Sequence, residues 1–206
     1  MARLNVNPTR MELKKLKARL NTAVRGHKLL KDKSDEMVRR FTVLLREDKR
    51  LRDEVGEELV STLKAFAVAR SVTAAYVAET AFAMPTVAVT AECGSESVMG
   101  VDVPKLEIVE NKRAEGLPYA FSEITSEADY SVQRAAKLLP RLLKLAEVEK
   151  AVRLLADEIE RNTRRVNALE YVMIPQLEET IKYIRNKLDE NERAAIVRLM
   201  KVKNKS

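Results

Sequence analysis

Apolar residues recur at alternating spacings of three and four through the first quarter of the chain. Ten of the thirteen positions on this path are apolar, and the residues between them are mostly charged. The path runs through Leu13, Leu16, Leu20, Ala23, His27, Leu30, Ser34, Met37, Phe41, Leu44, Asp48, Leu51 and Val55. A seam sustained over about six heptads is typical of a coiled coil. We therefore predict a helix over residues 7–79, which at ~1.5 Å per residue gives a rod of roughly 100 Å. Such a rod transmits torque or tethers partners, and it does not enclose a substrate.

A second stripe of the same kind predicts a second long helix over residues 124–203. It follows Leu138, Leu142, Leu145, Val148, Val152, Leu155, Ile159, Asn162, Val166, Leu169, Met173, Leu177, Ile181, Ile184 and Leu188. The spacing becomes 4-4 from Met173 to Ile181, a stutter that unwinds a supercoil locally. Pro175 lies inside the stutter and Pro140 lies near the helix start. Each proline removes an intrahelical hydrogen bond, so a local irregularity is predicted at both.

The residues at the helix ends, the polar residues on the seams and three methionines have structural interpretations. Thr9 with Glu12 fits a capping box at the first helix, and Ser122 or Thr125 can cap the second. Three of the polar residues on the seams, His27, Asp48 and Asn162, are interpreted as fixing the alignment of the helices. Three methionines, Met11, Met37 and Met173, are interpreted as filling gaps in the seam.

The segment between the two helices has a different composition. Its β-branched runs, from about residue 85 to 91 and from 98 to 109, predict a β-hairpin or two short strands. Gly94-Ser95-Glu96-Ser97 has turn composition, and Gly100 and Pro104 interrupt the second run. We therefore divide the chain into residues 1–80, 81–123 and 124–206. The predicted fold is mainly all-α, a long antiparallel two-helix coiled coil with a small β-hairpin or loop segment between its helices.

The net charge of +7 is concentrated at the two chain ends. Residues 1–33 carry +8 and residues 193–206 carry +5, whereas residues 85–125 carry −4. Antiparallel pairing would bring both basic ends to one tip, with the segment from Leu13 to Leu30 near the segment from Ile181 to Leu188. Positive charge attracts any anionic partner and does not show which one binds. A protein, nucleic acid and anionic lipid therefore all remain candidate partners of this tip.

Residues for catalysis or metal binding are scarce. The chain has one histidine and one cysteine, Cys93, and its glycines lack the spacing of a phosphate loop. We predict no catalytic residues, no cofactor and no metal. A single cysteine suits a reducing compartment. No run of about 18 apolar residues is present and the N-terminus lacks a signal-peptide core, which together predict a cytoplasmic protein.

Two blocks of sequence resemble a known family. The first contains Asn7-Pro8-Thr9-Arg10, then Leu13-Lys14-x-Leu16 and Arg25-Gly26-His27-Lys28-Leu29-Leu30. The second contains Arg164-Arg165-Val166-Asn167-Ala168-Leu169-Glu170, Ile174-Pro175-x-Leu177 and Leu188-Asp189-Glu190. Both are similar to the terminal helices of the D subunit of the V-type (archaeal/vacuolar-type) rotary ATPases, and the resemblance covers most of the chain.

The resemblance implies a non-catalytic central-stalk axle that couples ATP hydrolysis or synthesis in a catalytic head to ion transport through a membrane rotor. The implied partners are the A and B subunits of the head, the small F subunit of the stalk and a funnel-shaped subunit above the rotor. Nucleic-acid binding and direct membrane insertion are not implied. The candidate head-contacting residues of the basic tip are Arg10, Lys14, Arg19, Arg25, Lys28, Arg198 and Lys201. The candidate contact residues of the hairpin are Val87, Val89, Val98, Val101 and Val103. A static coiled-coil tether and a nucleic-acid-binding coiled coil are the alternatives.

Overall fold

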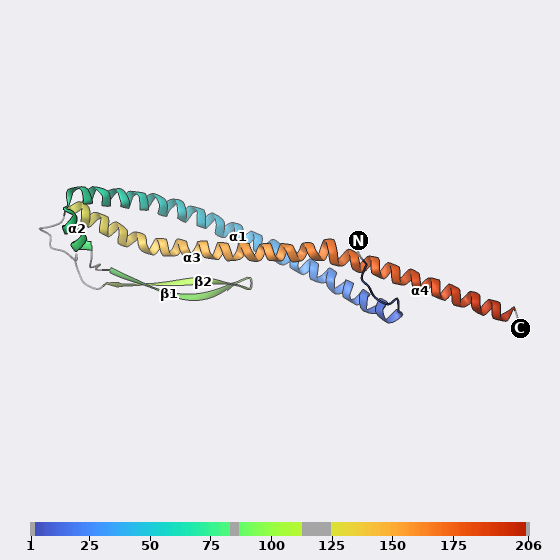
Figure 1. Cartoon of the computed structure of the whole chain (residues 1–206). Coiled ribbons are helices and arrows are strands. Elements are labelled where there is room, and N and C mark those ends of the chain that lie inside the picture. Colours follow the sequence, from blue (N-terminus) through green and yellow to red (C-terminus); the bar gives the residue numbers. More distant parts are fainter. Residues whose placement is uncertain (1–2, 83–86, 113–124, 205–206) are drawn as a thin grey trace. The chain divides into compact units, whose positions relative to one another are not determined.

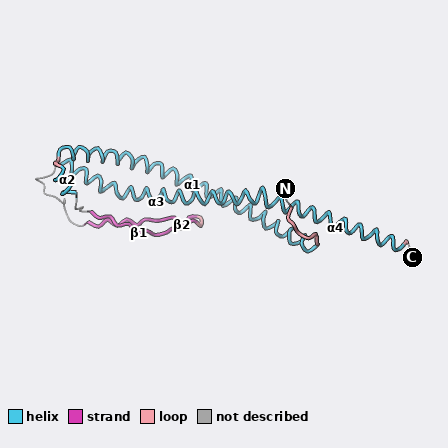
Figure 2. The backbone as a smooth tube through the Cα atoms, viewed as in Figure 1, coloured by secondary structure: helices cyan, strands magenta, loops and turns pink. Residues whose placement is uncertain are grey.

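The computed structural model describes residues 3–82, 87–112 and 125–204. In chain order its elements are α1 (Arg10–Val72), α2 (Ala75–Phe82), β1 (Val87–Val98), β2 (Val101–Lys112), α3 (Ser126–Ala168), the π-helical turn η1 (Leu169–Met173) and α4 (Ile174–Lys203). Figures 1 and 2 show these long helices and the single hairpin between them in sequence. The predicted fold class, a helical coiled coil with a small β-hairpin between its helices, is confirmed. None of the described helices combines the length and apolar character that a membrane span requires.

The chain forms two compact units. Residues 1–38 and 159–206 form the first, here called the terminal unit, and residues 39–158 form the second, here called the central unit. In the terminal unit, Arg10 contacts Glu192 and Met37 contacts Asn162, so α1 runs antiparallel to the second long helix. In the central unit, α1 and α3 are antiparallel as well, because Arg52 pairs with Glu149 and the later Glu58 pairs with the earlier Arg141.

The predicted seams are the buried faces of the helices. All thirteen positions on the α1 path are buried or partly buried, and on the second path only Met173 is exposed. In the terminal unit, the core cluster is Leu16, Ala23, Leu177 and Ile184, surrounded by further leucines and isoleucines. Apolar burial of ~25 cal/mol per Å² along this narrow stripe is the main source of stability for a two-helix unit.

The terminal unit corrects one detail of the predicted pairing. Leu13 and Leu20 pack against the cluster that contains Ile184, as predicted. His27, however, already lies opposite Glu170, at a distance of 3.2 Å between Nε2 and Oε2. Each step forward along α1 is a step backward along its antiparallel partner. Leu30 therefore lies farther from the segment from Ile181 to Leu188 than we predicted.

The first helix begins as predicted and ends early. The backbone N–H of Glu12 donates to Thr9 Oγ1 at 3.2 Å, which supplies one half of the predicted capping box. The helix ends at Val72 rather than at residue 79, and Ala75 starts the separate helix α2. At α3, the backbone carbonyl of Thr125 accepts from Ala128, while its Oγ1 is buried without a hydrogen-bond partner, so the predicted side-chain cap is absent there. Ser122 lies outside the described residues.

A π-helical turn accommodates the stutter and Pro175. In η1 the backbone N–H of Ile174 donates to the carbonyl of Leu169, five residues earlier. This turn contains one residue more than an α-turn, so Ile174 takes the seam position that we assigned to Met173. Met173 is 39% exposed, and the prediction that it fills a seam gap is wrong. The predicted irregularity near Pro175 is confirmed, whereas α3 continues without interruption through Pro140.

Of the other two methionines, one is buried and one is exposed. Met37 is fully buried, as predicted, and its Sδ accepts from Asn162 Nδ2 at 3.3 Å. Met11 is 69% exposed because it lies on the outer face of the first turn of α1, between the inward-facing positions of the seam. The prediction for Met11 is therefore wrong.

The three polar seam residues are buried or partly buried, as their positions predicted. Asn162 is 1% exposed and its Oδ1 accepts from Arg165 at 3.3 Å. Asp48 is 8% exposed, and its Oδ2 lies 3.8 Å from Arg52, while its Oδ1 has no hydrogen-bond partner. The contacts with Arg165 and Arg52 lie within one helix and do not depend on helix alignment, whereas the hydrogen bond of Asn162 to Met37 crosses to α1.

The hairpin is longer than predicted, and its turn lies elsewhere. β1 and β2 pair antiparallel over their whole length, from Val87 opposite Lys112 to Val98 opposite Val101. Met99 and Gly100 have φ angles of 57° and 82°, so both adopt the left-handed conformation of a type I′ turn. The predicted turn at Gly94-Ser95-Glu96-Ser97 is wrong, because these residues continue the strand. Gly100 supplies the conformational freedom that the turn requires.

Candidate partner-contact sites

All seven basic residues that we assigned to the tip are exposed. Arg10 forms an ion pair with Glu192, which places the start of α1 beside this position of α4. Arg25 and Lys28 lie near His27, roughly 27 Å along α1 from Arg10 at ~1.5 Å per residue. Arg198 and Lys201 lie on the far side of Glu192, in the last turns of α4. The basic residues therefore extend along the terminal unit instead of forming one compact cluster.

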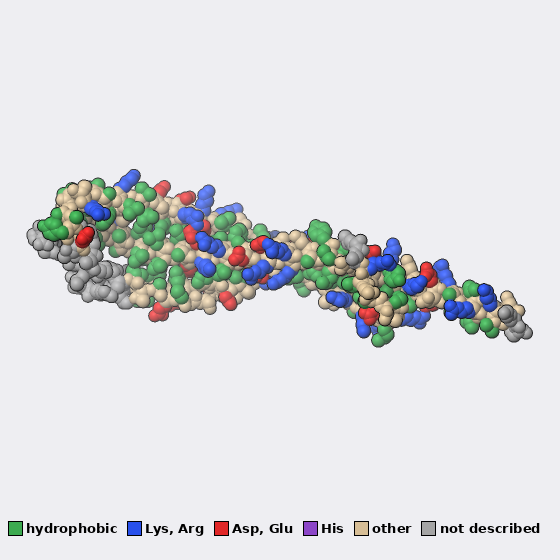
Figure 3. Space-filling model, viewed as in Figure 1, with side chains coloured by type: hydrophobic (Ala, Val, Ile, Leu, Met, Phe, Trp, Pro, Cys, Tyr) green, Lys and Arg blue, Asp and Glu red, His purple; other side chains and the backbone are tan. Residues whose placement is uncertain are grey.

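The last turns of α4 have no helix packed against them in the terminal unit. Every residue from 193 to 204 is exposed, and α1 begins at the level of Glu192. Figure 1 shows the red end of α4 continuing past the blue start of α1. Five apolar side chains there are between 50% and 70% exposed: Ile196, Val197, Leu199, Met200 and Val202. They lie among four basic residues, Arg193, Arg198, Lys201 and Lys203, and Figure 3 shows both kinds of side chain along this end.

An N-terminal arm, residues 3–9, supports α4 just before this projection. The backbone N–H of Leu4 donates to Thr180 Oγ1 at 3.2 Å, and the guanidinium of Arg3 lies 4.5 Å from the centre of the Tyr183 ring. Leu4 and Val6 pack against the terminal core cluster. Sequence reasoning missed this arm, because its only signal is two apolar residues before the helix cap.

The five candidate valines of the hairpin do not share one face. Alternate residues of a strand point to opposite faces, and the register places Val89 on one face and Val98, Val101 and Val103 on the other. Val103 is buried, at 7% exposed, and Val89, Val98 and Val101 are partly buried. Val87 pairs with Lys112, and its side chain lies outside the described residues.

A hydrogen bond joins the hairpin to α3 of the central unit. The backbone N–H of Leu106 in β2 donates to Glu147 Oε2 of α3 at 3.4 Å, and Figure 1 shows the hairpin running along α3. Across the strands, Lys105 Nζ donates to Glu96 Oε2 at 2.9 Å. This hydrogen bond, and then the charge of the same carboxylate, raises the pKa of Lys105 above its ordinary value. The hairpin is thus connected to α3 through its second strand.

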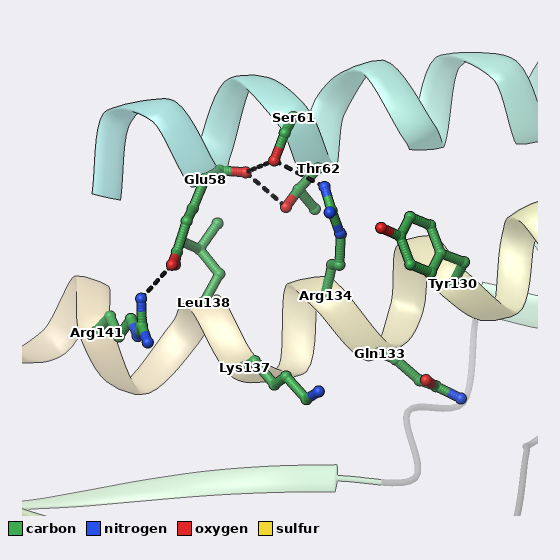
Figure 4. Close-up of a pocket in the computed structure, with 9 residues that line it drawn as sticks. All are labelled: Glu58, Ser61, Thr62, Tyr130, Gln133, Arg134, Lys137, Leu138 and Arg141. Carbon is green, nitrogen blue, oxygen red and sulfur yellow. Dashed lines mark hydrogen bonds and ion pairs between the residues drawn. The ribbon is translucent and has the colours of Figure 1, made fainter. Parts of the chain in front are cut away.

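A polar groove of about 360 Å³ lies between α1 and α3 of the central unit. Figure 4 shows its lining: Glu58, Ser61 and Thr62 of α1 face Arg134, Leu138 and Arg141 of α3, whereas Gln133 and Lys137 project from α3 away from α1. The α3 residues are Tyr130, Gln133, Arg134, Lys137, Leu138 and Arg141. Arg134 Nη1 donates to Ser61 Oγ at 2.9 Å, and its guanidinium lies 4.5 Å from the centre of the Tyr130 ring. Sequence reasoning missed the groove, since its basic residues have the spacing of an ordinary solvated helix face.

An apolar flank remains uncovered on α1 and α2 of the central unit. Phe66, Val68, Val72 and Tyr76 are between 37% and 75% exposed. Figure 3 shows hydrophobic side chains gathered over this part of α1 and α2. These four side chains stay accessible in the central unit. Exposed apolar groups of this extent are typical of protein interaction sites.

In the part of the chain that the structure describes, no three His, Cys, Asp or Glu residues lie together as a possible set of metal ligands. Cys93 is exposed on β1. His27 lies against Glu170 in the terminal unit, where it joins α1 to the first residues of η1.

Comparison with known proteins identifies the family. A family model for the D subunit of ATP synthase matches residues 12–204. The V-type ATP synthase D subunit of Thermoanaerobacter sp. (strain X514) is 52% identical over 203 residues, covering 98% of this chain and 97% of the relative. The D subunit of Clostridium botulinum (strain Alaska E43 / Type E3) is 51% identical over 207 residues, with 99% and 97% covered. That of Clostridium novyi (strain NT) is 50% identical over 206 residues, with 98% and 95% covered. The chain belongs to the family of ATP synthase D subunits.

Proposed function

We propose that this protein is the central-stalk axle of a V-type rotary ATPase. In this role it couples ATP hydrolysis or synthesis in the catalytic head to ion transport through the membrane rotor, and it contributes no catalytic group itself. The observation that carries the proposal is the exposed end of α4, a helix whose last turns bear basic and apolar side chains and no packed helix. Membership of the D-subunit family supports it.

The side chains at this end suit a rotating contact with the A and B subunits of the head. Lys and Arg side chains are long and flexible, so they can exchange acidic partners as the axle turns. The five apolar residues between them add hydrophobic contact, which is non-directional and does not fix one rotational angle. The seven basic residues assigned to the tip, from Arg10 to Lys201, would contact the head in this arrangement.

The central unit is proposed to contact the other partners. The uncovered flank of Phe66, Val68, Val72 and Tyr76 offers an apolar surface to the small F subunit or to the funnel-shaped subunit above the membrane rotor. Neither contact requires insertion into the membrane or binding of nucleic acid. The protein would then lie in the cytoplasm, peripheral to the membrane, as part of the complex.

Reconstitution with the head tests the axle role. Head complexes with and without this protein are compared for ATP turnover, and rotation is followed in the complex that contains it through a bead attached to the exposed Cys93. An axle is required for directional rotation and for sustained turnover. A complex that turns over ATP equally well without the protein would instead indicate a static tether. Salt-dependent binding of the isolated protein to DNA or RNA would favour the nucleic-acid alternative.

We expect the hairpin to be dispensable for the helices and necessary for contact. Replacing Val87–Lys112 with a short Gly/Ser turn should preserve helicity, because the seams of α1 and α3 lie outside the hairpin. ATP turnover or binding of the small F subunit should change. Circular dichroism and turnover of the reconstituted complex measure the two effects. Loss of helicity would show that the hairpin is structural, and unchanged turnover and binding would remove its contact role.

A further inference from the structure

The groove of the central unit carries more positive charge than its surroundings. Its lining includes Arg134, Lys137 and Arg141 against a single acid, Glu58, a net charge of +2. Residues 39–158 as a whole contain 17 Lys and Arg and 20 Asp and Glu, a net charge of −3. A cationic site within an acidic unit is selective for an anionic group that reaches it.

The cations of the groove are held in position before any ligand arrives. Ser61 accepts one hydrogen bond from Arg134, and the ring of Tyr130 lies against its guanidinium. Arg141 is paired with Glu58. Guanidinium stacking and hydrogen bonding leave further N–H groups of Arg134 available in a planar fork, which matches the two oxygens of a carboxylate. Because these side chains are already ordered, they lose less conformational entropy when a ligand binds.

Lys137 adds a second cation of α3 that is not ion-paired with any described residue, on the side of the helix that points away from α1 (Figure 4). It lies three residues after Arg134 on the same helix. Below this row, Leu138 is only 4% exposed and forms an apolar floor. Tyrosine and arginine over an apolar floor are the residue types enriched where protein interfaces hold most of their binding energy.

We propose that this groove binds the carboxylate of an acidic side chain from a partner protein. Another protein supplies carboxylates as Asp and Glu side chains, whose two oxygens match the planar fork of Arg134. A nucleic-acid backbone would need a basic track that continues beyond the groove, and farther along α3 Lys144 is paired with Glu147. The proposal rests on the proposed function, since the partner would be another protein of the same complex.

Zero-length crosslinking of the purified complex tests the proposal. A carbodiimide joins an amine directly to a carboxylate in contact with it, so Lys137 should form an amide with an Asp or Glu of another protein of the complex. Mass spectrometry of the digested complex identifies the joined peptides. Lys137→Arg keeps the charge and removes the amine, so it should abolish this crosslink and retain the assembly. Crosslinks of Lys137 to its own chain alone, or none at all, would overturn the proposal.

Substitution of the groove gives an independent measurement. Arg134→Gln with Lys137→Gln should weaken binding of the crosslinked partner about tenfold or more, as expected for the loss of charged hydrogen bonds. The matched control is Lys64→Gln with Lys150→Gln, two exposed lysines of the same unit outside the groove. Circular dichroism confirms that both variants stay helical. Equal binding by the two double variants would overturn the proposal.

Inorganic phosphate provides the competing ligand. It is titrated into the full-length protein while the NMR signals of the Arg134 guanidinium and the Tyr130 ring are followed. Shifts at low phosphate concentration, without a Lys137 crosslink to a partner protein, would replace the carboxylate site with a phosphate site. The crosslink is measured separately from turnover and rotation, so failure of the groove proposal is distinguishable from failure of the axle role.

Discussion

Ile184→Asp should unfold the terminal unit of the isolated protein. Ile184 is fully buried in the cluster with Leu16, Ala23 and Leu177. Loss of a buried isoleucine side chain alone costs about 2–5 kcal/mol. The new carboxylate would also be buried without a partner, which adds to the loss. Urea denaturation followed by circular dichroism measures the change in the free energy of unfolding.

The same substitution on the uncovered end of α4 is the matched control. Val197 is 50% exposed and lies beyond the start of α1, so Val197→Asp removes little buried surface. We expect it to change the free energy of unfolding by under ~0.5 kcal/mol. Hydrogen exchange locates the damage of Ile184→Asp, which should be greatest in residues 3–38 and 159–204. Equal stability of the two variants would contradict the assigned core.

The sequence predicted the buried faces of the helices because burial follows helical periodicity directly. Every seam position from Leu13 to Val55 is buried or partly buried, including the polar Asp48. Helix alignment was predicted less well. Periodicity shows which face of a helix is buried, but not which residue of one helix lies opposite which residue of the other. The ion pair of Arg10 with Glu192 and the contact of His27 with Glu170 define this alignment.

Local backbone chemistry explains the remaining differences. The stutter and Pro175 indicated an irregularity, and the π-helical turn determines that Ile174, not Met173, faces inward. In the hairpin, we assigned turn composition to Gly94-Ser95-Glu96-Ser97 and took Gly100 only as an interruption of the second run. Gly100 instead has the left-handed φ that a type I′ turn needs. Gly94 is one residue of a paired strand instead.

The candidate sites were predictable only where a single segment forms them. The exposed basic residues of the α4 end were visible in the sequence, because they follow one another along a helix with no intervening acid. The groove depends on Ser61 lying opposite Arg134 and on Glu58 lying opposite Arg141. These pairs are 73 and 83 residues apart in the chain, so no local pattern brings them together.

Charge reversal of the basic tip should separate function from folding. The variant replaces seven exposed residues with Glu: Arg10, Lys14, Arg19, Arg25, Lys28, Arg198 and Lys201. Each reversal lowers the charge by two, so the net charge of the chain falls from +7 to −7. Exposed charge changes cost under ~0.5 kcal/mol each. Near the start of α1 the new acids even favour the helix dipole, whereas near the end of α4 they oppose it. Helicity should therefore change little.

Association with the head should fall sharply in the same variant, because repulsion replaces attraction at every basic position of the tip. Binding and ATP turnover of the reconstituted complex are measured at about 0.15 M and 1 M salt, where the screening length shrinks from ~8 Å to ~3 Å. High salt should weaken the binding of the natural protein and reduce its advantage over the variant.

A second variant with the same net charge provides the control. It reverses seven exposed basic residues of the central unit: Arg39, Arg46, Lys49, Lys64, Arg70, Lys150 and Arg153. If the position of the charge matters, this control binds the head better than the tip variant, although both chains carry −7. Equal loss of binding would mean that net charge alone controls assembly. Unfolding of the tip variant with unimpaired turnover of its complex would contradict a role for these residues in coupling.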